Sequence, residues 1–485
     1  MNVKERNRMR QDYRRKTKII CTLGPSTDAE ETMEELIKSG MNIARFNFSH
    51  GDHAEQEERL KHLKNVRKKL NAPVAAMLDT KGPEIRLRLF KNGSVDLVEG
   101  QSFRLTTRDV EGDETQVSIS YEDLPKDVRE GDHILLDDGL IQLQVKSVNG
   151  PDINCIVENG GHISDKKGVN VPNVDLSMPY ISPKDRSDLI FGVEQGFDFI
   201  AASFTRTAAD INEIRQLLHE HGGDNIRILA KIENNQGIDN IDSIIEAADG
   251  IMVARGDMGV EIPMEEVPSL QKMIIKKTYT QGKFVITATQ MLDSMIHHPR
   301  PTRAEATDVA NAVYDGTSAI MLSGETAMGD YPVEAVRAMD KIARRTEQDI
   351  NYLSRAARYE RGNSENVTDA ISHSACLMAD DLRAAAIVSV TLSGRTAHNI
   401  AKYRPHSPII ACCTDPQVWR QLNMNWGVTP VLVDKLDDED ELFQTALQAS
   451  KKARLVQDGD IAILTAGVPL GISGTTNVIR EMTVH

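Results

Sequence analysis

The chain has 485 residues, of which 40% are hydrophobic, 27% charged and only 4% aromatic. This balance is typical of a globular protein of about three domains and excludes a disordered or fibrous chain. The 57 Lys and Arg residues against 72 Asp and Glu residues give a net charge of −15, which argues against nucleic-acid binding. The five cysteines form no C-x-x-C pair, and no apolar run is long enough to span a membrane. We therefore expect a soluble cytoplasmic protein.

Short β-branched runs alternate with amphipathic segments through the first and middle parts of the chain. Eight runs predict strands: Lys18–Leu23, Met41–Phe48, Val74–Leu78, Phe197–Ser203, Arg227–Ile232, Gly250–Val253, Lys283–Ala288 and Ser318–Leu322. Intervening segments predict helices: Asp28–Lys38, Glu55–Leu70, Ile238–Ala247, Val267–Tyr279 and Arg303–Val313. Because eight strand–helix units close a parallel barrel, we expect an α/β fold built on a (β/α)8 TIM barrel.

The pattern changes between the third and fourth strands. From about Arg86 to Val171 the residues alternate with a period of two between Gly, Asp and Asn turns, and no long helix is visible. We therefore expect a small β-barrel domain, residues 86–171, inserted into a TIM barrel formed by residues 1–85 and 172–353.

The chain after the eighth unit predicts a second α/β domain. Val333–Tyr352 has a helical pattern, and the polar segment Arg355–Glu365 is typical of a linker. Four further runs predict strands separated by helices: Ala384–Val390, Pro408–Cys412, Thr429–Val433 and Ile461–Thr465. Residues 354–485 are therefore expected to form a smaller C-terminal domain.

Unusual polar residues gather where the barrel strands end, which is where the active residues of such barrels lie. Because side chains alternate along a strand, Arg45, Asn47 and Ser49 share one face of the second strand. Asp79 and Thr80 end the third strand. An Arg among Asn, Ser, Asp and Thr oxygens suits a phosphate beside a hard cation.

The later strand ends add the groups that phosphoryl transfer requires. Lys231 and Glu233 share a face of the fifth strand, and Gly256 and Asp257 follow the sixth. Two carboxylates with room for water and a phosphate predict a Mg²⁺ site. The seventh and eighth strands offer hydroxyl groups, and a Lys, an Arg and a metal ion supply charge neutralisation.

Taken singly, each of these motifs has a purely structural explanation. Lys231 and Glu233 could form an ion pair at a strand end, Gly256–Gly259 a turn, and Asn47–His50 a cap for the following helix. A functional site is favoured because six strand ends of one barrel carry such groups.

Six stretches, in order and at barrel spacing, resemble the pyruvate kinase family. They are Asn42–Gly51, Met77–Arg86, Lys231–Asn234, Met252–Glu261, Ile286–Met295 and Leu322–Pro332, and the inserted domain adds Asp137–Ile141 and Lys166–Asn170. The resemblance covers nearly the whole chain and is to the bacterial type, without the extra C-terminal module of some relatives. It implies transfer of the phosphoryl group of phosphoenolpyruvate to ADP, giving pyruvate and ATP.

The resemblance implies a role for each matched position at the barrel mouth. Lys231 would neutralise the transferring phosphoryl group, and Arg45 would bind the phosphate of phosphoenolpyruvate. Glu233 and Asp257 would hold Mg²⁺ or Mn²⁺. Gly256 and Asp257 would bind the carboxylate of the substrate, with Thr289 beside them. Thr289 and Ser323 would lie on the proton path to the enolate carbon.

The resemblance also implies a monovalent-cation site and a nucleotide site. The K⁺ ligands would be Asn47, Ser49, Asp79 and Thr80. The nucleotide would lie near Asn47, Ser49, His50, Arg86 and Lys167, with the last reaching in from the inserted domain acting as a lid. Glu84 is the residue carried by members that need K⁺, so K⁺ dependence is expected.

The C-terminal domain resembles the regulatory domain of the family. Thr391, Ser393, Gly394, Arg395 and Thr396 are similar to its pocket for the phosphate of an effector, and a hydroxyl that caps a helix is the alternative. The loop Ala466–Gly474 lacks the Trp and Arg of eukaryotic relatives that respond to fructose 1,6-bisphosphate. The resemblance implies a homotetramer with a phosphorylated allosteric effector.

Two alternatives are open at this point. A Mg²⁺-dependent aldolase or lyase acting on phosphoenolpyruvate or pyruvate would share the two carboxylates, but it would need neither Lys167 nor a monovalent site. A non-catalytic metabolite sensor should have lost Lys231, Glu233 or Asp257, and all three are present.

Overall fold

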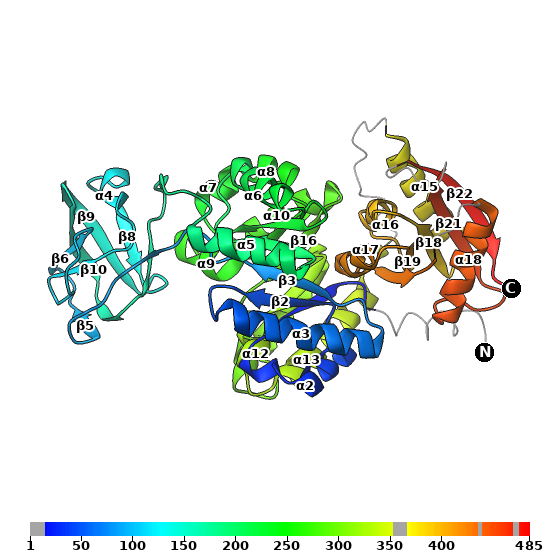
Figure 1. Ribbon diagram of the computed structural model, residues 1–485, viewed down its shortest axis with the longest axis horizontal. Coiled ribbons are helices and arrows are strands. Elements are labelled where there is room, and N and C mark those ends of the chain that lie inside the picture. The colour runs from blue at the N-terminus through cyan, green and yellow to red at the C-terminus, as the bar shows by residue number, and fades with distance from the viewer. Residues whose placement is uncertain (1–14, 353–365, 435–438, 469–474) are drawn as a thin grey trace.

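The computed structural model describes residues 15–352, 366–434, 439–468 and 475–485. Its centre is a closed barrel of parallel strands in the order β1-β17-β16-β15-β14-β13-β3-β2 (Figure 1). The strands are β1 (Lys18–Thr22), β2 (Ile43–Asn47), β3 (Ala75–Asp79), β13 (Phe199–Ala202), β14 (Arg227–Ile232), β15 (Gly250–Ala254), β16 (Phe284–Ala288) and β17 (Ala319–Leu322). The predicted barrel is confirmed, and the predicted strand ends differ from these by at most two residues.

The barrel is surrounded by helices that follow its strands. They include α2 (Glu30–Ser39), α3 (His53–Leu70), α5 (Pro183–Gln195), α6 (Ala208–Glu220), α10 (Val267–Thr280), α11 (Arg303–Asp315) and α13 (Pro332–Asp349). The predicted helix Ile238–Ala247 is instead two, α7 (Asn235–Asp239) and α8 (Ile241–Ala247). The break falls at Asn240, whose amide donates to the carbonyls of Arg206 and Gln236.

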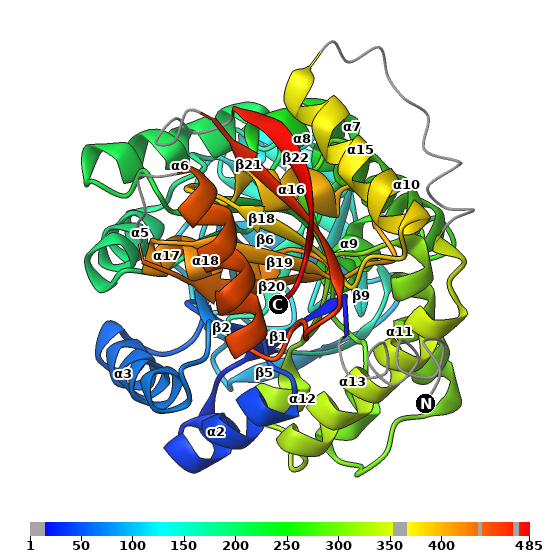
Figure 2. The ribbon, with the colours of Figure 1, turned by 90° about the vertical axis from the view of Figure 1, so that its right-hand side faces the viewer.

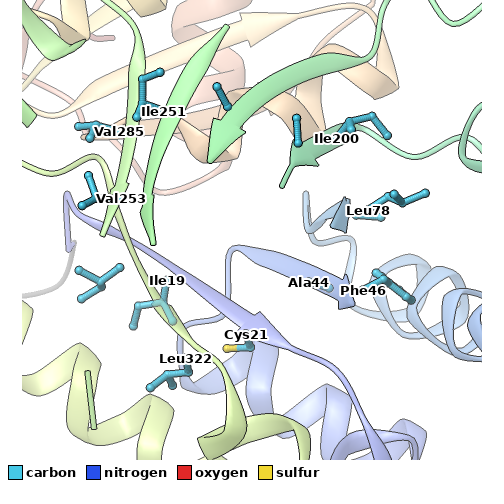
Figure 3. Close-up of a cluster of buried hydrophobic side chains, with 14 of the residues drawn as sticks. Ile19, Cys21, Ala44, Phe46, Leu78, Ile200, Ile251, Val253, Val285 and Leu322 are labelled. Carbon is cyan, nitrogen blue, oxygen red and sulfur yellow. The ribbon is translucent and has the colours of Figure 1, made fainter. Parts of the chain in front are cut away.

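Alternation along the barrel strands separates two hydrophobic clusters. Ile19 and Cys21 of β1 point outward into the cluster between strands and helices (Figure 3). Ile20, between them, belongs to the cluster inside the barrel. All three side chains are fully buried, so a one-residue change of register would exchange the two cores. The closely packed wall holds the strand ends in fixed positions.

The predicted insertion lies between β3 and α5 and forms a separate body at one end of the molecule (Figure 1). Its seven-stranded sheet has the order β4-β12-β8-β9-β10-β6-β7, and β11 pairs with β5 in a second sheet. These strands are β4 (Ile85–Arg86), β5 (Ser94–Leu97), β6 (Ser102–Thr106), β7 (Gln116–Ser118), β8 (His133–Leu136), β9 (Ile141–Asn149), β10 (Asp152–Asn159), β11 (Gly161–Ser164) and β12 (Gly168–Asn170). The helix within it is the four-residue α4 (Leu124–Asp127), and the domain has its own hydrophobic core.

The C-terminal domain is a five-stranded sheet in the order β20-β19-β18-β21-β22. Its elements are α15 (Val367–Asp381), β18 (Ala386–Val390), α16 (Arg395–Ala401), β19 (Ile409–Cys413), α17 (Pro416–Gln421), β20 (Val428–Leu432), α18 (Glu439–Lys452), β21 (Ile461–Gly467) and β22 (Thr476–Thr483). The sequence pattern does not predict the antiparallel strand β22, because exposed Arg480 and Glu481 interrupt its alternation. The predicted linker Arg355–Glu365 lies outside the described residues, as does most of the loop Ala466–Gly474.

This domain covers the end of the barrel opposite the inserted domain (Figure 2). Arg420 of α17 forms an ion pair of 2.8 Å with Asp198, which directly precedes β13 and is fully buried. The side-chain amide of Gln421 donates to the Asp198 carbonyl over 3.1 Å. Met424 joins the cluster inside the barrel, and Lys18 Nζ donates to the carbonyl of Val428 over 2.6 Å. The C-terminal domain therefore closes the floor of the barrel.

His398 of α16 makes the stability of this floor depend on pH. Its ring centroid lies 4.9 Å from that of Phe284, and burial lowers its pKa to about 4. Between about pH 6.5 and pH 4 the His398 imidazole is therefore protonated in the unfolded chain but neutral in the folded chain. The free energy of unfolding consequently decreases as the pH falls through this range. We expect His398→Gln to reduce the loss of unfolding free energy in urea between pH 7 and pH 4.5 by up to about 3 kcal/mol. An identical pH profile for both proteins would contradict this.

Among the described residues, no helix combines the length and the apolar character that crossing a membrane requires.

Candidate active site

Two cations converge on one carboxylate at the mouth of the barrel. Asp79 ends β3, and its Oδ2 lies 2.6 Å from Arg45 Nε of the neighbouring strand β2. Its Oδ1 lies 3.1 Å from Lys231 Nζ of β14. Burial raises the pKa of Asp79, but Arg45 and Lys231 more than offset this and hold the pKa below its ordinary value. Asp79 is therefore ionised, and it fixes two positive groups in the position that a phosphate would need.

Lys231 is also paired with Glu233, as the shared strand face predicts. Lys231 Nζ lies 3.1 Å from Glu233 Oε1, while Glu233 Oε2 accepts a hydrogen bond of 2.6 Å from the Phe204 amide. Burial lowers the pKa of Lys231, but Asp79 and Glu233 raise it above its ordinary value, so this lysine is protonated. Burial raises the pKa of Glu233 to about 8, and Lys231 offsets this only in part.

The carboxylate of Glu233 has the character of a cation ligand. It is 1% exposed, and its Oε1 has no aligned hydrogen bond among the residues that the structure describes. Asp257 lies close enough to raise the pKa of Glu233 further. No group of three or more His, Cys, Asp or Glu side chains in the described ranges could hold a metal ion. Mg²⁺ needs only one or two carboxylates besides water and phosphate, so this pair fits it.

The sixth and seventh strand ends meet through a hydrogen bond. Gly256 is the second residue of α9 (Arg255–Glu261), and its amide donates to Thr289 Oγ1 over 2.8 Å. Thr289 and Gln290 both have positive φ, 66° and 52°, which is strained for residues with a side chain. Arg255 holds this segment by donating to the Thr289 carbonyl over 2.7 Å, while its other nitrogen pairs with Asp308.

Ser323, after the eighth strand, has a free hydroxyl group. Its Oγ is buried and has no hydrogen-bond partner within the described part of the chain. Its backbone amide donates to Glu325 Oε2 over 2.7 Å, and Glu325 Oε1 accepts from the Leu292 amide. The hydroxyl is therefore held in place by the backbone and is available to a substrate or a water molecule.

The predicted K⁺ ligands lie on adjacent strands. Asn47 and Asp79 are paired in the register of β2 and β3. Asn47 Oδ1 accepts from the Ser49 amide over 3.0 Å, and Thr80 Oγ1 accepts from the Ser203 amide over 3.1 Å. These oxygens suit a hard monovalent cation. Asn47–His50 do not cap the following helix through their side chains, because Asp52 accepts the Glu55 amide at the start of α3.

The predicted nucleotide residues lie on both sides of the connection between the barrel and the inserted domain. Arg86 forms an ion pair with Glu84 and donates to the carbonyl of Lys166 over 2.7 Å. Lys167 Nζ lies 2.9 Å from Asp137 Oδ1 within the inserted domain. His50 is exposed at the barrel mouth. The structure therefore gives these side chains partners of their own and does not gather them into one closed pocket.

Comparison with known proteins decides the family. Residues 14–336 match the family model described as pyruvate kinase, barrel domain, and residues 369–480 match that of its alpha/beta domain. The chain belongs to the pyruvate kinase family. The pyruvate kinase of Clostridium acetobutylicum is 52% identical over 97% of this chain and 100% of its own length. That of Geobacillus stearothermophilus is 50% identical over 96% of this chain and 80% of its own length.

A solved structure confirms the fold at full length. The crystal structure of a pyruvate kinase from Cryptosporidium parvum superposes with a TM-score of 0.94 at 40% identity, covering 98% of this chain and 97% of the other. The expected fold, the pyruvate kinase family and the phosphotransferase class are thereby confirmed. These matches set aside the aldolase or lyase alternative.

The predicted effector residues of this pyruvate kinase family member surround the start of α16. The helix begins after Gly394, which has a φ of 82°, and this N-cap glycine supplies no side-chain hydrogen bond to the start of the helix. Thr391 and Thr396 are buried, Thr396 Oγ1 lies 2.8 Å from Thr476 Oγ1 of β22, and Arg395 is exposed.

Sequence reasoning missed two residues that support the pyruvate kinase site. Arg255 holds the strained Thr289 segment, and Ser203 contacts Lys231 over 2.7 Å. Ser203 carried a usable signal, because it is a polar residue at the end of the predicted fourth strand, like those that mark the other strand ends. Arg255 carried none, since its partners Thr289 and Asp308 are distant in the sequence.

Proposed function

We propose that this chain transfers the phosphoryl group of phosphoenolpyruvate to ADP with the residues described above, giving pyruvate and ATP in the last step of glycolysis. The observation that carries the proposal is the convergence of Arg45 and Lys231 on Asp79, beside the buried Glu233, whose Oε1 has an ion pair with Lys231 but no aligned hydrogen bond among the described residues. Such a site offers a dianionic phosphate two fixed cations and a place for a third.

The roles of the barrel residues follow from their surroundings. Arg45 binds the phosphate, and protonated Lys231 neutralises the phosphoryl group as it moves and the enolate that it leaves. Glu233 and Asp257 hold Mg²⁺ or Mn²⁺, which supplies further positive charge when bound. Gly256 and Asp257 hold the carboxylate end of the substrate, with Thr289 beside it. Since Arg45, Lys231 and Glu233 are already fixed by hydrogen bonds, these three groups need little reorganisation during transfer.

Enolpyruvate becomes pyruvate when its methylene carbon takes up a proton. We propose that Thr289 and Ser323 guide this proton, with water as the final donor. The free hydroxyl of Ser323 supports this role, because it can hydrogen-bond to such a water molecule without losing another partner. Thr289 Oγ1 donates to the Ala288 carbonyl over 2.6 Å and accepts from Gly256, so it connects the proton path to the substrate site.

The nucleotide site is proposed to assemble between the barrel mouth and the inserted domain. Asn47, Ser49 and His50 contribute from the barrel side, and Arg86 and Lys167 from the other side. Arg86 and Lys167 are held by Glu84 and Asp137. ADP phosphates would exchange these ion pairs for stronger charge-assisted contacts when the inserted domain closes as a lid.

Pyruvate formation is expected to require both Mg²⁺ and K⁺. Asn47, Ser49, Asp79 and Thr80 supply oxygen ligands for K⁺, and Glu84 is the residue associated with this need. The measurement is steady-state pyruvate formation from phosphoenolpyruvate and ADP with Mg²⁺, in parallel K⁺ and Na⁺ buffers. We expect the rate in K⁺ to be at least about tenfold higher than the rate in Na⁺, because losing one charge-assisted contact at a phosphate site has an effect of about this size.

Two outcomes of this assay contradict parts of the proposal. Full activity in Na⁺ would remove the K⁺ site. No pyruvate in either buffer, from protein shown to be folded, would favour the non-catalytic sensor.

The proposal also covers the oligomeric state, the effector site and the cellular compartment of the protein. We propose a cytoplasmic homotetramer that binds a phosphorylated effector at Thr391, Ser393, Gly394, Arg395 and Thr396. Self-association is supported by α15, which exposes 63% of Val367 and 44% of Leu377, and by the neighbouring Leu382, 43% exposed, beside the edge strand β22. Sedimentation velocity measures the assembly, and a monomer at micromolar concentration would contradict it.

A further inference from the structure

Ser203 connects two parts of the barrel mouth, the phosphoryl site around Lys231 and the predicted K⁺ site. It directly follows β13 and is 2% exposed. Its hydroxyl accepts a hydrogen bond of 2.7 Å from Lys231 Nζ and donates to the Thr80 carbonyl over 2.6 Å. It also lies 3.1 Å from Asp79 Oδ1. One buried oxygen therefore contacts the phosphoryl-neutralising lysine and both K⁺-site residues of the third strand end.

The contact with Thr80 is made twice. The Ser203 backbone amide donates to Thr80 Oγ1 over 3.1 Å, and the Ser203 hydroxyl donates to the Thr80 carbonyl. Gly82 permits this close approach, since a Cβ there would lie only 2.9 Å from Ser203 Cβ. The position of Thr80 and the position of the Ser203 hydroxyl are therefore set together.

The Ser203 hydroxyl is the third polar group in contact with the Lys231 ammonium. Lys231 Nζ donates to Asp79 Oδ1 over 3.1 Å and to the Ser203 hydroxyl over 2.7 Å. It also lies 3.1 Å from Glu233 Oε1, with which it forms an ion pair but no aligned hydrogen bond. Without the Ser203 oxygen, Lys231 Nζ is held by two carboxylates alone. One of these, Asp79, is shared with Arg45 and with the predicted K⁺ site. The Ser203 hydroxyl is thus the uncharged contact of Lys231, and it remains when K⁺ or substrate binds beside the two carboxylates.

We propose that Ser203 is a positioning residue that couples K⁺ binding at Asp79 and Thr80 to the placement of Lys231 at the phosphoryl group. The inference rests on the K⁺ and phosphoryl sites of the proposed function. Ser203 is not itself a ligand of the cation or of the substrate. When K⁺ binds, it attracts the oxygens of Thr80 and Asp79. Because Ser203 is hydrogen-bonded to both residues and to Lys231, their movement changes the position of the Lys231 ammonium group.

Equilibrium binding of phosphoenolpyruvate tests this without turnover. The dissociation constant is measured by calorimetry with Mg²⁺ and no ADP, in K⁺ and in Na⁺ buffers, for the full-length protein. The ratio of the two constants is the coupling between cation and substrate, and we expect about fivefold or more in the unmodified protein. Ser203→Ala is expected to bring the ratio close to 1 and to lower kcat by about tenfold or more. Ser203→Thr, which keeps the hydroxyl, should retain the coupling.

Thr205→Val is the matched control. Thr205 is fully buried two residues further along, and its hydroxyl donates to the Ala202 carbonyl over 2.9 Å and lies 3.3 Å from the Tyr180 hydroxyl. Its backbone amide donates to the Lys231 carbonyl over 3.3 Å, and the substitution to valine keeps this bond. Its loss removes an equally buried hydrogen bond, so it should lower the unfolding temperature and leave the coupling ratio unchanged.

Each result bears on a different claim. A full coupling ratio in folded Ser203→Ala overturns the inference and leaves the proposed function intact. A ratio lost equally in Thr205→Val also overturns it, because the effect would then be structural. If the unmodified protein makes no pyruvate, the proposed function is overturned. If it makes pyruvate but binds phosphoenolpyruvate equally well in K⁺ and Na⁺, the inference is overturned, because the proposed coupling to the K⁺ site is then absent.

Discussion

Pyruvate formation is expected to fall by about 10³-fold or more when Lys231 is replaced by methionine. Methionine keeps most of the volume of the side chain but removes the ammonium group that Asp79, Glu233 and Ser203 hold in place. The lost charge acts on the phosphoryl group in transit, so kcat should fall more than the affinity for phosphoenolpyruvate. Steady-state kinetics with saturating Mg²⁺ and K⁺ measure both.

Lys283→Met is the matched control for this prediction. Lys283 is a partly buried lysine beside β16 at the opposite end of the barrel, where it donates to the carbonyls of Ile245, Glu246 and Ala248. Both substitutions remove a lysine from the barrel, but only Lys231 lies at the mouth. Similar losses of kcat in the two variants would contradict the assignment, and thermal unfolding of each shows whether the protein is folded.

Glu233→Gln is expected to abolish at least about 99% of the activity with little change in the stability of the metal-free protein, because the cost of burying the carboxylate largely offsets its ion pair with Lys231. The carboxylate is buried, and burial raises its pKa to about 8, so its charged form is disfavoured in the folded state. Glutamine has the same shape, and its carbonyl oxygen can still accept the Phe204 amide, but its neutral amide group then replaces the carboxylate oxygen beside Lys231. If the Glu233→Gln protein keeps its stability but loses its activity, Glu233 serves to bind a cation rather than to stabilise the fold.

Glu347→Gln should show the opposite pattern. Glu347 is 8% exposed, and its two oxygens accept the backbone amides of Lys16 and Thr17 over 2.8 Å and 2.7 Å, far from the barrel mouth. Glutamine can accept only one of them, so stability should fall while kcat is retained. Unfolding in urea and steady-state assays on both variants separate the two roles. A Glu233→Gln protein that loses stability and keeps its Mg²⁺ requirement would contradict our assignment.

The sequence predicts the barrel well because its signal is local. Each strand is a short apolar run that is buried on both faces, as β15 is along its whole length, and each run ends at a polar residue. The position of active residues at strand ends therefore predicts Lys231, Glu233 and Asp257 as candidate site residues from the sequence alone. Strand β22 and the break at Asn240 lack such a signal, because an exposed edge and a side-chain contact with another loop decide them.

The contacts within the site could not be predicted in the same way. Sequence alternation places Arg45 and Lys231 on inward faces, but it does not state that Asp79 bridges them. That bridge depends on the register between β2 and β3 and on the closure of the barrel, which brings residues 152 positions apart within 3.1 Å. The role of Ser203 is of the same kind, since it is defined entirely by partners on other strands.

Strand β13 is also the shortest mechanical path between the two ends of the molecule. Asp198, held by Arg420 of the C-terminal domain, lies at its start, and Ser203 lies at its end, roughly 16 Å away. An extended strand bonded to neighbours on both sides, as β13 is to β3 and β14, resists compression along its axis. We therefore expect a rotation of the C-terminal domain that pushes on Asp198 to displace Ser203 as well. Any effector that produces such a rotation is expected to change the K⁺ concentration needed for half-maximal activity, and a K⁺ titration with and without it would reveal this.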